Sequence, residues 1–104
     1  MSLIDEVTSA VRQSSDVLVV IDPRRIPHVA RDLVASLPGA AYRRAYREVR
    51  CDGGVRVKLL SNRDPHRLRG YRVPLVCVGA GTPAETRHEA QRCVIPDGRL
   101  YCEG

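Results

Sequence analysis

The feature that most restricts the fold is a run of five apolar residues, Val17–Ile21, enclosed by Asp16 and by Asp22-Pro23. A short run with no polar residue at alternate positions predicts a strand buried on both faces, as in a parallel sheet covered by helices. Residues 75–78 form a second such run. The 104 residues suffice for one domain. We therefore predict a single α/β domain, residues 1–104, with these two segments as central parallel strands of a small sheet.

Three segments have the sequence patterns of helices. Apolar side chains recur at intervals of three and four in residues 3–14, which begin beside a capping pair, Ser2 and Asp5. Residues 26–37 have the same periodicity and a proline in the first turn. Residues 83–93 follow Thr82-Pro83-Ala84-Glu85, a capping-box sequence with proline at the first helical position. We expect these helices to pack on the faces of the sheet.

A β-hairpin is predicted in the middle of the chain. Residues 46–51 and 55–59 flank the turn Asp52-Gly53-Gly54, and apolar and basic residues alternate in the second segment. The outer face of this hairpin is therefore basic. A helix over residues 40–50 is the alternative for the first segment, because Tyr42, Tyr46 and Val49 have helical spacing. Residues 61–71 contain Asn, Asp, Pro and Gly at short intervals and are expected to form a loop.

The positive charge of the chain is concentrated in one stretch. Residues 43–72 contain ten basic and three acidic residues, a net charge of +7, whereas the rest of the chain has a net charge of −2. Such a stretch attracts polyanions through phosphate contacts and counterion release, although a solvated basic surface without a partner is the alternative. Arginine contact without interleaved aromatic residues favours the phosphate backbone over base stacking. The residues that we expect to bind nucleic acid are Arg43, Arg44, Arg47, Arg56, Lys58, Arg67, Arg69 and Arg72.

The ends of the two central strands are a second kind of candidate site, because α/β sheets bind ligands at the carboxyl ends of parallel strands. Asp22-Pro23-Arg24-Arg25 follows the first strand, and Gly79-Ala80-Gly81-Thr82 leads from the second into a helix N-terminus. The candidate anion-binding residues are Arg24, Arg25, Gly81 and Thr82. Ordinary turns are the alternative, since neither a dinucleotide fingerprint nor a phosphate loop is present.

The cysteines predict a disulfide more readily than a metal site. Residues 94–101 have Asp97-Gly98 at their centre and predict a hairpin that places Cys93 opposite Cys102. These two thiols are expected to form a disulfide in an oxidising buffer and to stay reduced in the cytoplasm. Adding His88 gives at most a three-ligand zinc site, and no Cys-x-x-Cys pair exists, so we predict no metal and no cofactor.

Enzymatic and membrane functions are not indicated. No nucleophile, activated acid or metal site converges in the sequence, so we predict a protein that is not an enzyme. No apolar run approaches the roughly 20 residues that span a bilayer, and the N-terminus lacks the layout of a signal peptide. We expect a soluble, cytoplasmic protein without membrane contact.

The order of the segments resembles the ATPase core of phage large terminase subunits and of superfamily 2 helicases, over residues 16–80. The matching segments are the strand that ends in Asp22-Pro23, helix 26–37, Gly53-Gly54 with the strand ending at Ser61, Leu68-Arg69-Gly70, and residues 75–78. The resemblance implies half of a P-loop NTPase-like core, with Arg67, Arg69 and Arg72 in the Leu-Arg-Gly loop as nucleic-acid contacts. No phosphate loop precedes the first strand, and Gly79-Ala80 stands where the family has the Walker B acids, so both catalytic elements are missing. The resemblance thus implies a relict fold reused for binding.

Three classes of function follow from these observations. The leading hypothesis is a small non-enzymatic binding protein of phage or actinobacterial type that contacts nucleic acid or a host protein through residues 43–72. One alternative is a nucleotide- or phosphate-ligand-binding protein, enzymatic or not, that uses the two strand ends. Another is a structural protein that forms homo-oligomers by strand addition at exposed edges of residues 45–60 and 94–102.

Overall fold

A computed structural model describes residues 2–104 as a six-stranded mixed sheet with the order β2-β3-β4-β1-β5-β6. The strands are β1 (Val17–Ile21), β2 (Ala41–Arg43), β3 (Glu48–Arg50), β4 (Arg56–Ser61), β5 (Val73–Val78) and β6 (Val94–Cys102). The helices are α1 (Leu3–Arg12), α2 (Ile26–Ser36) and α3 (Ala84–Arg92), and the 3-10 turns are η1 (Pro23–Arg25), η2 (Arg44–Tyr46), η3 (Asp52–Gly54) and η4 (Pro65–Leu68). The predicted parallel pair is confirmed, because Val17 lies beside Leu75 and Val20 beside Val78.

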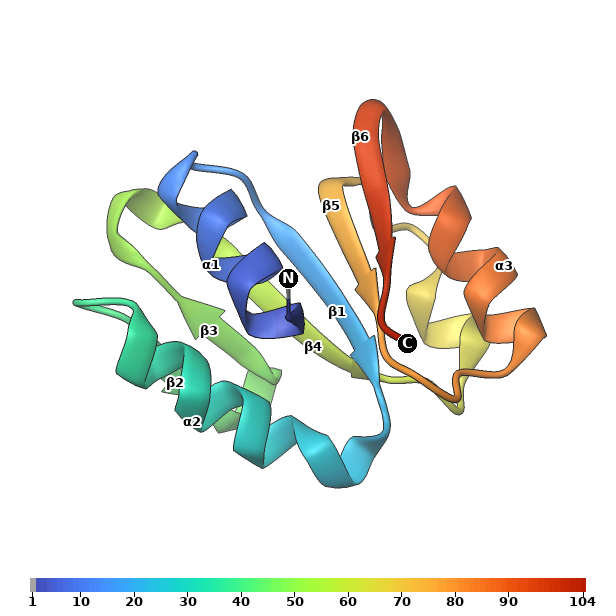
Figure 1. The fold of residues 1–104 in the computed structure, drawn as a ribbon, viewed down its shortest axis with the longest axis horizontal. Helices are drawn as coiled ribbons and strands as arrows, with labels where there is room; N and C mark the ends of the chain where they lie inside the picture. The colour runs from blue at the N-terminus through green and yellow to red at the C-terminus, as the bar shows by residue number, and fades with distance from the viewer. Residues whose placement is uncertain (1) are drawn as a thin grey trace.

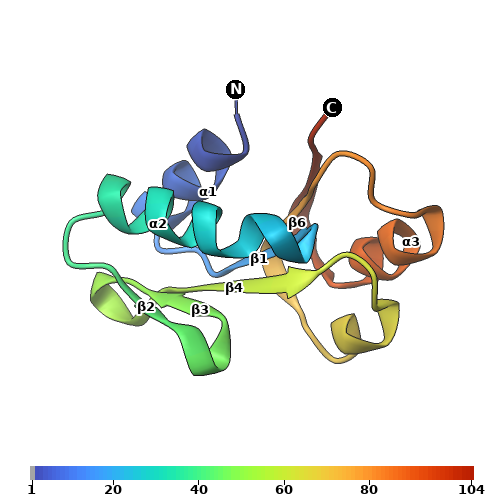
Figure 2. The same ribbon diagram turned by 90° about the horizontal axis from the view of Figure 1, so that it is seen from below.

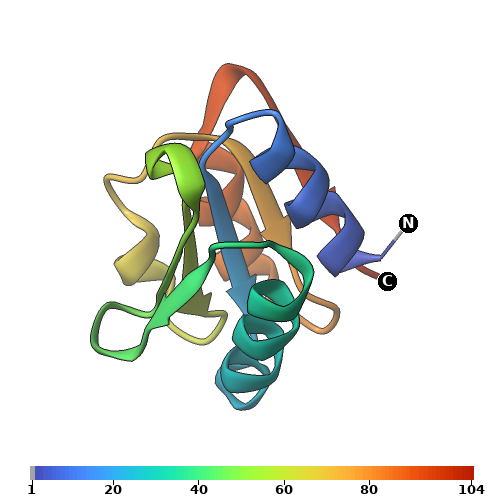
Figure 3. The ribbon, with the colours of Figure 1, turned by 90° about the vertical axis from the view of Figure 1, so that its left-hand side faces the viewer.

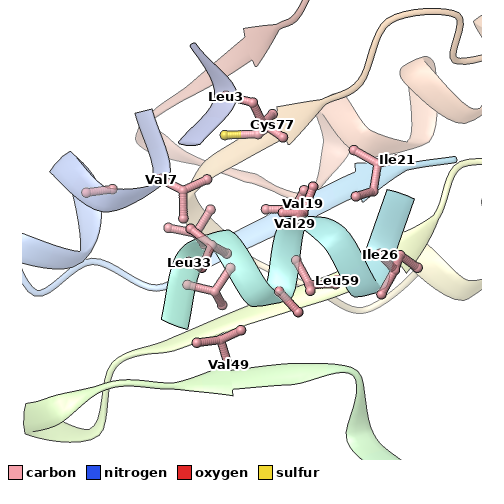
Figure 4. Close-up of a cluster of buried hydrophobic side chains, with 14 of the residues drawn as sticks. Leu3, Val7, Val19, Ile21, Ile26, Val29, Leu33, Val49, Leu59 and Cys77 are labelled. Atoms are coloured by element: carbon pink, nitrogen blue, oxygen red, sulfur yellow. The ribbon is translucent and has the colours of Figure 1, made fainter. Parts of the chain in front are cut away.

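The elements form three layers with β1 at the centre. Helices α1 and α2 cover one face of the sheet, and α3 and η4 cover the other (Figures 1 and 3). Val17, Val19 and Ile21 pack under α1 and α2, as Figure 4 shows for part of this core, whereas Leu18 and Val20 pack under α3 and η4. All five residues of β1 are buried, which explains its uninterrupted apolar run.

Capping differs between the first and the last helix. The capping pair of α1 is confirmed, because the Ser2 hydroxyl accepts from the Asp5 amide at 3.1 Å and the Asp5 carboxylate accepts from the Ser2 amide at 3.2 Å. The capping box expected at Thr82 is wrong, since Pro83 is the N-cap of α3 and no side chain caps it. The buried Thr82 hydroxyl instead donates to the Gly79 carbonyl at 2.7 Å and accepts from the side-chain amide of Asn62 at 3.1 Å. Asn62 and Thr82 are both buried, and the side-chain amide of Asn62 needs this acceptor, so the Thr82 hydroxyl is not used to cap α3.

The predicted central hairpin is confirmed, but it does not form the edge of the sheet. Strands β3 and β4 pair in antiparallel fashion with Glu48 beside Lys58. Strand β2, which was not predicted, has three residues, pairs with β3 and occupies the edge. Tyr42 of β2 packs against the core under α1 and α2. A strand of three residues is too short to show the alternation of apolar and polar residues by which strands are predicted. The expected exposed edge at residues 45–60 is therefore wrong.

The second predicted hairpin, at residues 94–101, is also wrong. Residues 94–102 belong to one strand, β6, which runs parallel to β5. Asp97-Gly98 lies where the register shifts, because Val73 pairs with Val94 but Leu75 pairs with Arg99, and this part of β6 arches away in Figure 1. A Cβ atom on Gly98 would lie 2.4 Å from the Pro74 carbonyl oxygen, so close approach, rather than a two-residue turn, requires this glycine. Pairing of β6 with β5 is favoured over the local hairpin because it gives hydrogen-bond partners to backbone groups of β5 that would otherwise be free.

Candidate nucleic-acid interface

The eight basic residues expected to bind nucleic acid do not form one cluster. Arg44, Arg47, Lys58 and Arg67 line two hollows beside the connection between β2 and β3. Arg43 and Arg56 lie on the face of the β2–β4 strands that also bears Lys58, opposite the face of Val49 and Val57 that packs under α1 and α2. Arg69 and Arg72 line a third hollow, together with Arg92 and Glu89. The fold thus spreads the basic stretch over several surfaces, of which one hollow and the strand face share Lys58.

The largest of these hollows, about 430 Å³, has cationic and aromatic walls. One wall is the η2 turn with Arg47, the other contains Arg67 and Tyr71, and Lys58 and Leu60 of β4 form the floor. Figure 2 shows the two chain segments that carry these walls, the β2–β3 connection and η4, on the same side of β4, away from α1 and α2. We call this hollow the basic groove; its lining residues are Ala45, Tyr46, Arg47, Lys58, Leu60, Arg67 and Tyr71.

The basic groove keeps a positive charge because its cations are only partly neutralised. Arg67 Nε donates to an Asp64 carboxylate oxygen at 3.1 Å, and Lys58 Nζ donates to the Tyr46 carbonyl oxygen at 2.5 Å. The neighbouring Glu48 is 8% exposed and accepts a hydrogen bond of 3.0 Å from Arg50. Within residues 2–104, no carboxylate lies within 4.0 Å of the Arg44, Arg47 or Lys58 cations.

Arg47 has an unusual backbone for a residue with a long side chain. Its φ of 49° and ψ of 49° are left-handed, a conformation that costs a non-glycine residue about 1 kcal/mol. Two backbone hydrogen bonds hold it there: its amide donates to the Arg44 carbonyl at 3.2 Å, and its carbonyl accepts from the Leu59 amide at 2.8 Å. Arg47 also lines the second hollow, about 390 Å³, which includes Pro23, Pro27, Tyr42 and Arg44. The strained residue therefore stands between two hollows.

Aromatic side chains accompany the cations, contrary to the sequence-based expectation. Tyr46 is 58% exposed, and both it and the half-buried Tyr71 line the basic groove. Burial, followed by the charge of Glu48, raises the pKa of Tyr71, so this phenol stays neutral at physiological pH. The two tyrosines lie at opposite ends of the basic stretch, and only the fold brings them to one groove, which is why the sequence pattern did not reveal them.

The candidate anion-binding residues at the strand ends are engaged with other parts of the chain. Asp22 accepts from the Arg24 amide at 2.9 Å and from the Arg24 guanidinium at 2.8 Å, and these bonds hold the pKa of Asp22 well below its usual range. Arg25 forms an ion pair with Glu103. Thr82 is buried against Asn62, whereas Gly81 is exposed with a φ of 79°. The structure does not gather these four residues around one hollow.

The predicted disulfide is wrong because β6 is a continuous strand. Cys93 is buried just before Val94, which pairs with Val73, whereas the exposed Cys102 pairs with Val78. Five steps along β5 separate these positions, at least about 16 Å at roughly 3.3 Å per residue. All four cysteines are free thiols. Nor is there, among the described residues, a group of three His, Cys, Asp or Glu side chains that could hold a metal ion.

The four thiols are expected to react with dithionitrobenzoate in an order set by burial. Exposed Cys102 should react within minutes, half-buried Cys51 more slowly, and Cys77 and Cys93 only after unfolding. Burial raises the pKa of Cys77 to about 12, and burial also raises the pKa of Cys51 and Cys93, so little thiolate forms at those sites. The measurement is the number of modified thiols over time, native and in guanidinium. A Cys93–Cys102 disulfide in the mass spectrum of oxidised native protein would contradict the pairing of β5 with β6.

No known protein family, curated protein or solved structure matches the chain. In the described part of the chain, no helix is both long enough and apolar enough to cross a membrane. The functional conclusion therefore depends on the geometry of the site itself.

Proposed function

We propose that this protein binds single-stranded nucleic acid along the basic groove, without catalysing a reaction. Arg47 and Lys58 would contact backbone phosphates in the groove, Arg44 would contact one in the adjoining hollow, and a base would stack on Tyr46. The observation that carries the proposal is the basic groove itself, where cations without a carboxylate partner lie beside an exposed aromatic ring.

The shape and lining of the groove support a single strand over a duplex. A hollow of about 430 Å³ is within the range that holds a nucleotide-sized group. Tyr46 is the one large apolar side chain exposed among residues 2–104, and aromatic rings beside cations are typical of surfaces that stack successive unpaired bases. In a duplex the bases are already stacked on one another, so only the phosphate contacts remain.

The strain at Arg47 supports a functional role for this residue. A left-handed arginine persists only where the surrounding structure enforces it, and such residues are concentrated at binding sites.

The same proposal includes the resemblance to terminase and helicase cores. In a relict of that kind, Arg67 at the edge of the Leu-Arg-Gly loop would keep its nucleic-acid contact, while Arg43, Arg56, Arg69 and Arg72 would add phosphate contacts outside the groove.

The test is a fluorescence-anisotropy titration of labelled 12-residue DNA and RNA strands, single and duplex, at about 50 and 200 mM salt. Three phosphate contacts on a single strand predict affinity about 20-fold lower at the higher salt concentration. The variant Tyr46→Ala should weaken binding of the single strand about 10-fold and leave duplex binding unchanged, because only unpaired bases stack on the ring.

Two results would contradict the proposal. Absence of binding at the lower salt concentration would leave the arginines as a solvated surface. Equal effects of Tyr46→Ala on single strand and duplex would remove the stacking contact and leave a general attraction to phosphate.

A further inference from the structure

The Glu103 carboxylate accepts hydrogen bonds from a group of donors that lies just after the end of β5. Arg25 donates from Nη1 to Glu103 Oε1 at 2.6 Å and from Nη2 to Oε2 at 3.0 Å. The Ala80 amide donates to the same Oε1 at 3.1 Å. A guanidinium fork combined with a backbone amide is an arrangement that binds oxyanions, including phosphate, with geometric specificity. The donors are therefore suited to an oxyanion, and in the structure the Glu103 carboxylate accepts from all of them.

The position of these donors is the usual ligand position of an α/β sheet. Strands β1 and β5 are parallel neighbours. The chain after β1 leads to β2, β3 and β4 on one side of this pair, and the chain after β5 leads to β6 on the other side, so the two connections diverge at the carboxyl ends of the strands. Arg25 follows β1, and Ala80 follows β5. The donors thus converge from two parallel strands on the point where the sheet order switches.

Gly79 makes this convergence sterically possible. A Cβ atom at position 79 would lie 2.9 Å from Ile21 Cγ2 and 3.3 Å from Arg25 Nη1. The backbone just after β5 therefore lies so close to Ile21 and to the guanidinium that a Cβ atom would force the Ile21 side chain to shift and would press on Arg25. The φ of Gly79 is not in the left-handed region, so close packing, not backbone conformation, accounts for glycine here.

From these contacts we infer that Arg25 and the Ala80 amide form a phosphate-binding site that Glu103 masks as an internal competitor. The ligand is a phosphate group, either free inorganic phosphate or the terminal phosphate of a nucleic-acid strand. The pair is only partly buried, with side-chain exposures of 39% for Arg25 and 26% for Glu103, so an external anion can reach it. A tethered competitor acts at a high effective concentration and lowers the apparent affinity for the external ligand. The inference does not depend on the basic groove, which neither donor lines.

The test compares inorganic phosphate binding by calorimetry, at constant ionic strength, in the native protein and in Glu103→Ala. Removing the carboxylate should tighten phosphate binding by about 10-fold or more, because the internal competitor is lost. Glu103→Gln should give a smaller gain, since its amide oxygen still accepts a bond from Arg25. The double variant Arg25→Ala/Glu103→Ala should lose the gain. A 5′-phosphorylated tetranucleotide and its 5′-hydroxyl form distinguish the sources: preference of Glu103→Ala for the phosphorylated strand over free phosphate identifies a strand end.

Two outcomes would overturn the inference. The first is equal phosphate affinity in the native protein and in Glu103→Ala, with circular dichroism showing that the variant is folded. The second is a gain that persists in the double variant, which would place the phosphate elsewhere. Either result would make the Arg25–Glu103 pair a structural clasp and would leave the single-strand proposal untouched.

Discussion

The double variant Arg44→Glu/Arg47→Glu should bind a single-stranded oligonucleotide about 100-fold more weakly than the native protein, a loss of about 2.7 kcal/mol. Both side chains are exposed and have no carboxylate within 4.0 Å among residues 2–104, so the native protein has no internal ion pair to lose. Reversal removes two phosphate contacts and adds repulsion. Anisotropy titrations over a salt series should also show a slope of log K against log salt reduced by about 1.4, because each single-strand contact contributes about 0.7.

A matched control separates a local contact from the net charge of the protein. Arg12 and Arg31 are exposed on α1 and α2, which cover the opposite face of the sheet. The variant Arg12→Glu/Arg31→Glu changes the net charge by the same amount, yet it should weaken binding by only about 3-fold, because salt screens distant charges. Equal losses in the two double variants would show that the basic groove and the adjoining hollow lined by Arg44 are not the binding site.

Replacing Leu68 with alanine should cost about 3 kcal/mol of unfolding free energy. Leu68 is fully buried in η4 and belongs to the cluster of Leu18, Val20 and Val76 on the second face of the sheet. Its carbonyl accepts from Cys93 Sγ at 3.1 Å and from the Tyr71 amide at 3.3 Å, so the segment cannot collapse freely into the cavity that the smaller side chain leaves. For a domain with a typical stability of about 5–15 kcal/mol this is a large fraction, measurable by urea unfolding.

The neighbouring residue provides the control for this substitution. Arg69→Ala changes an exposed side chain without an ion-pair partner in the described chain and should alter stability by less than about 0.5 kcal/mol. A loss below about 1 kcal/mol for Leu68→Ala would mean that η4 packs loosely on the sheet. In that case the Arg67 wall of the basic groove would not be fixed in the native state.

Elements whose local pattern and tertiary environment agree were predicted from the sequence. Strand β1 has the predicted bounds, and α1 begins at its capping pair, because burial on both faces and N-terminal capping depend on neighbouring residues. The β3–β4 hairpin follows from a glycine turn and an alternating strand. The residues after Cys93 show the opposite case, since Asp97-Gly98 is a local hairpin signal that pairing with β5 overrides.

The sequence determined, by itself, that a buried parallel strand stands at the centre of an α/β domain and that positive charge is concentrated in residues 43–72. Apolar periodicity and charge are properties of neighbouring residues, so they can be read without a fold. Only the tertiary structure decided which charges share a surface: it placed Arg47 and Arg67 in one groove with two tyrosines, and it joined Arg25 to Glu103 across the sheet. Such contacts between distant residues depend on strand order and register, which local patterns do not encode.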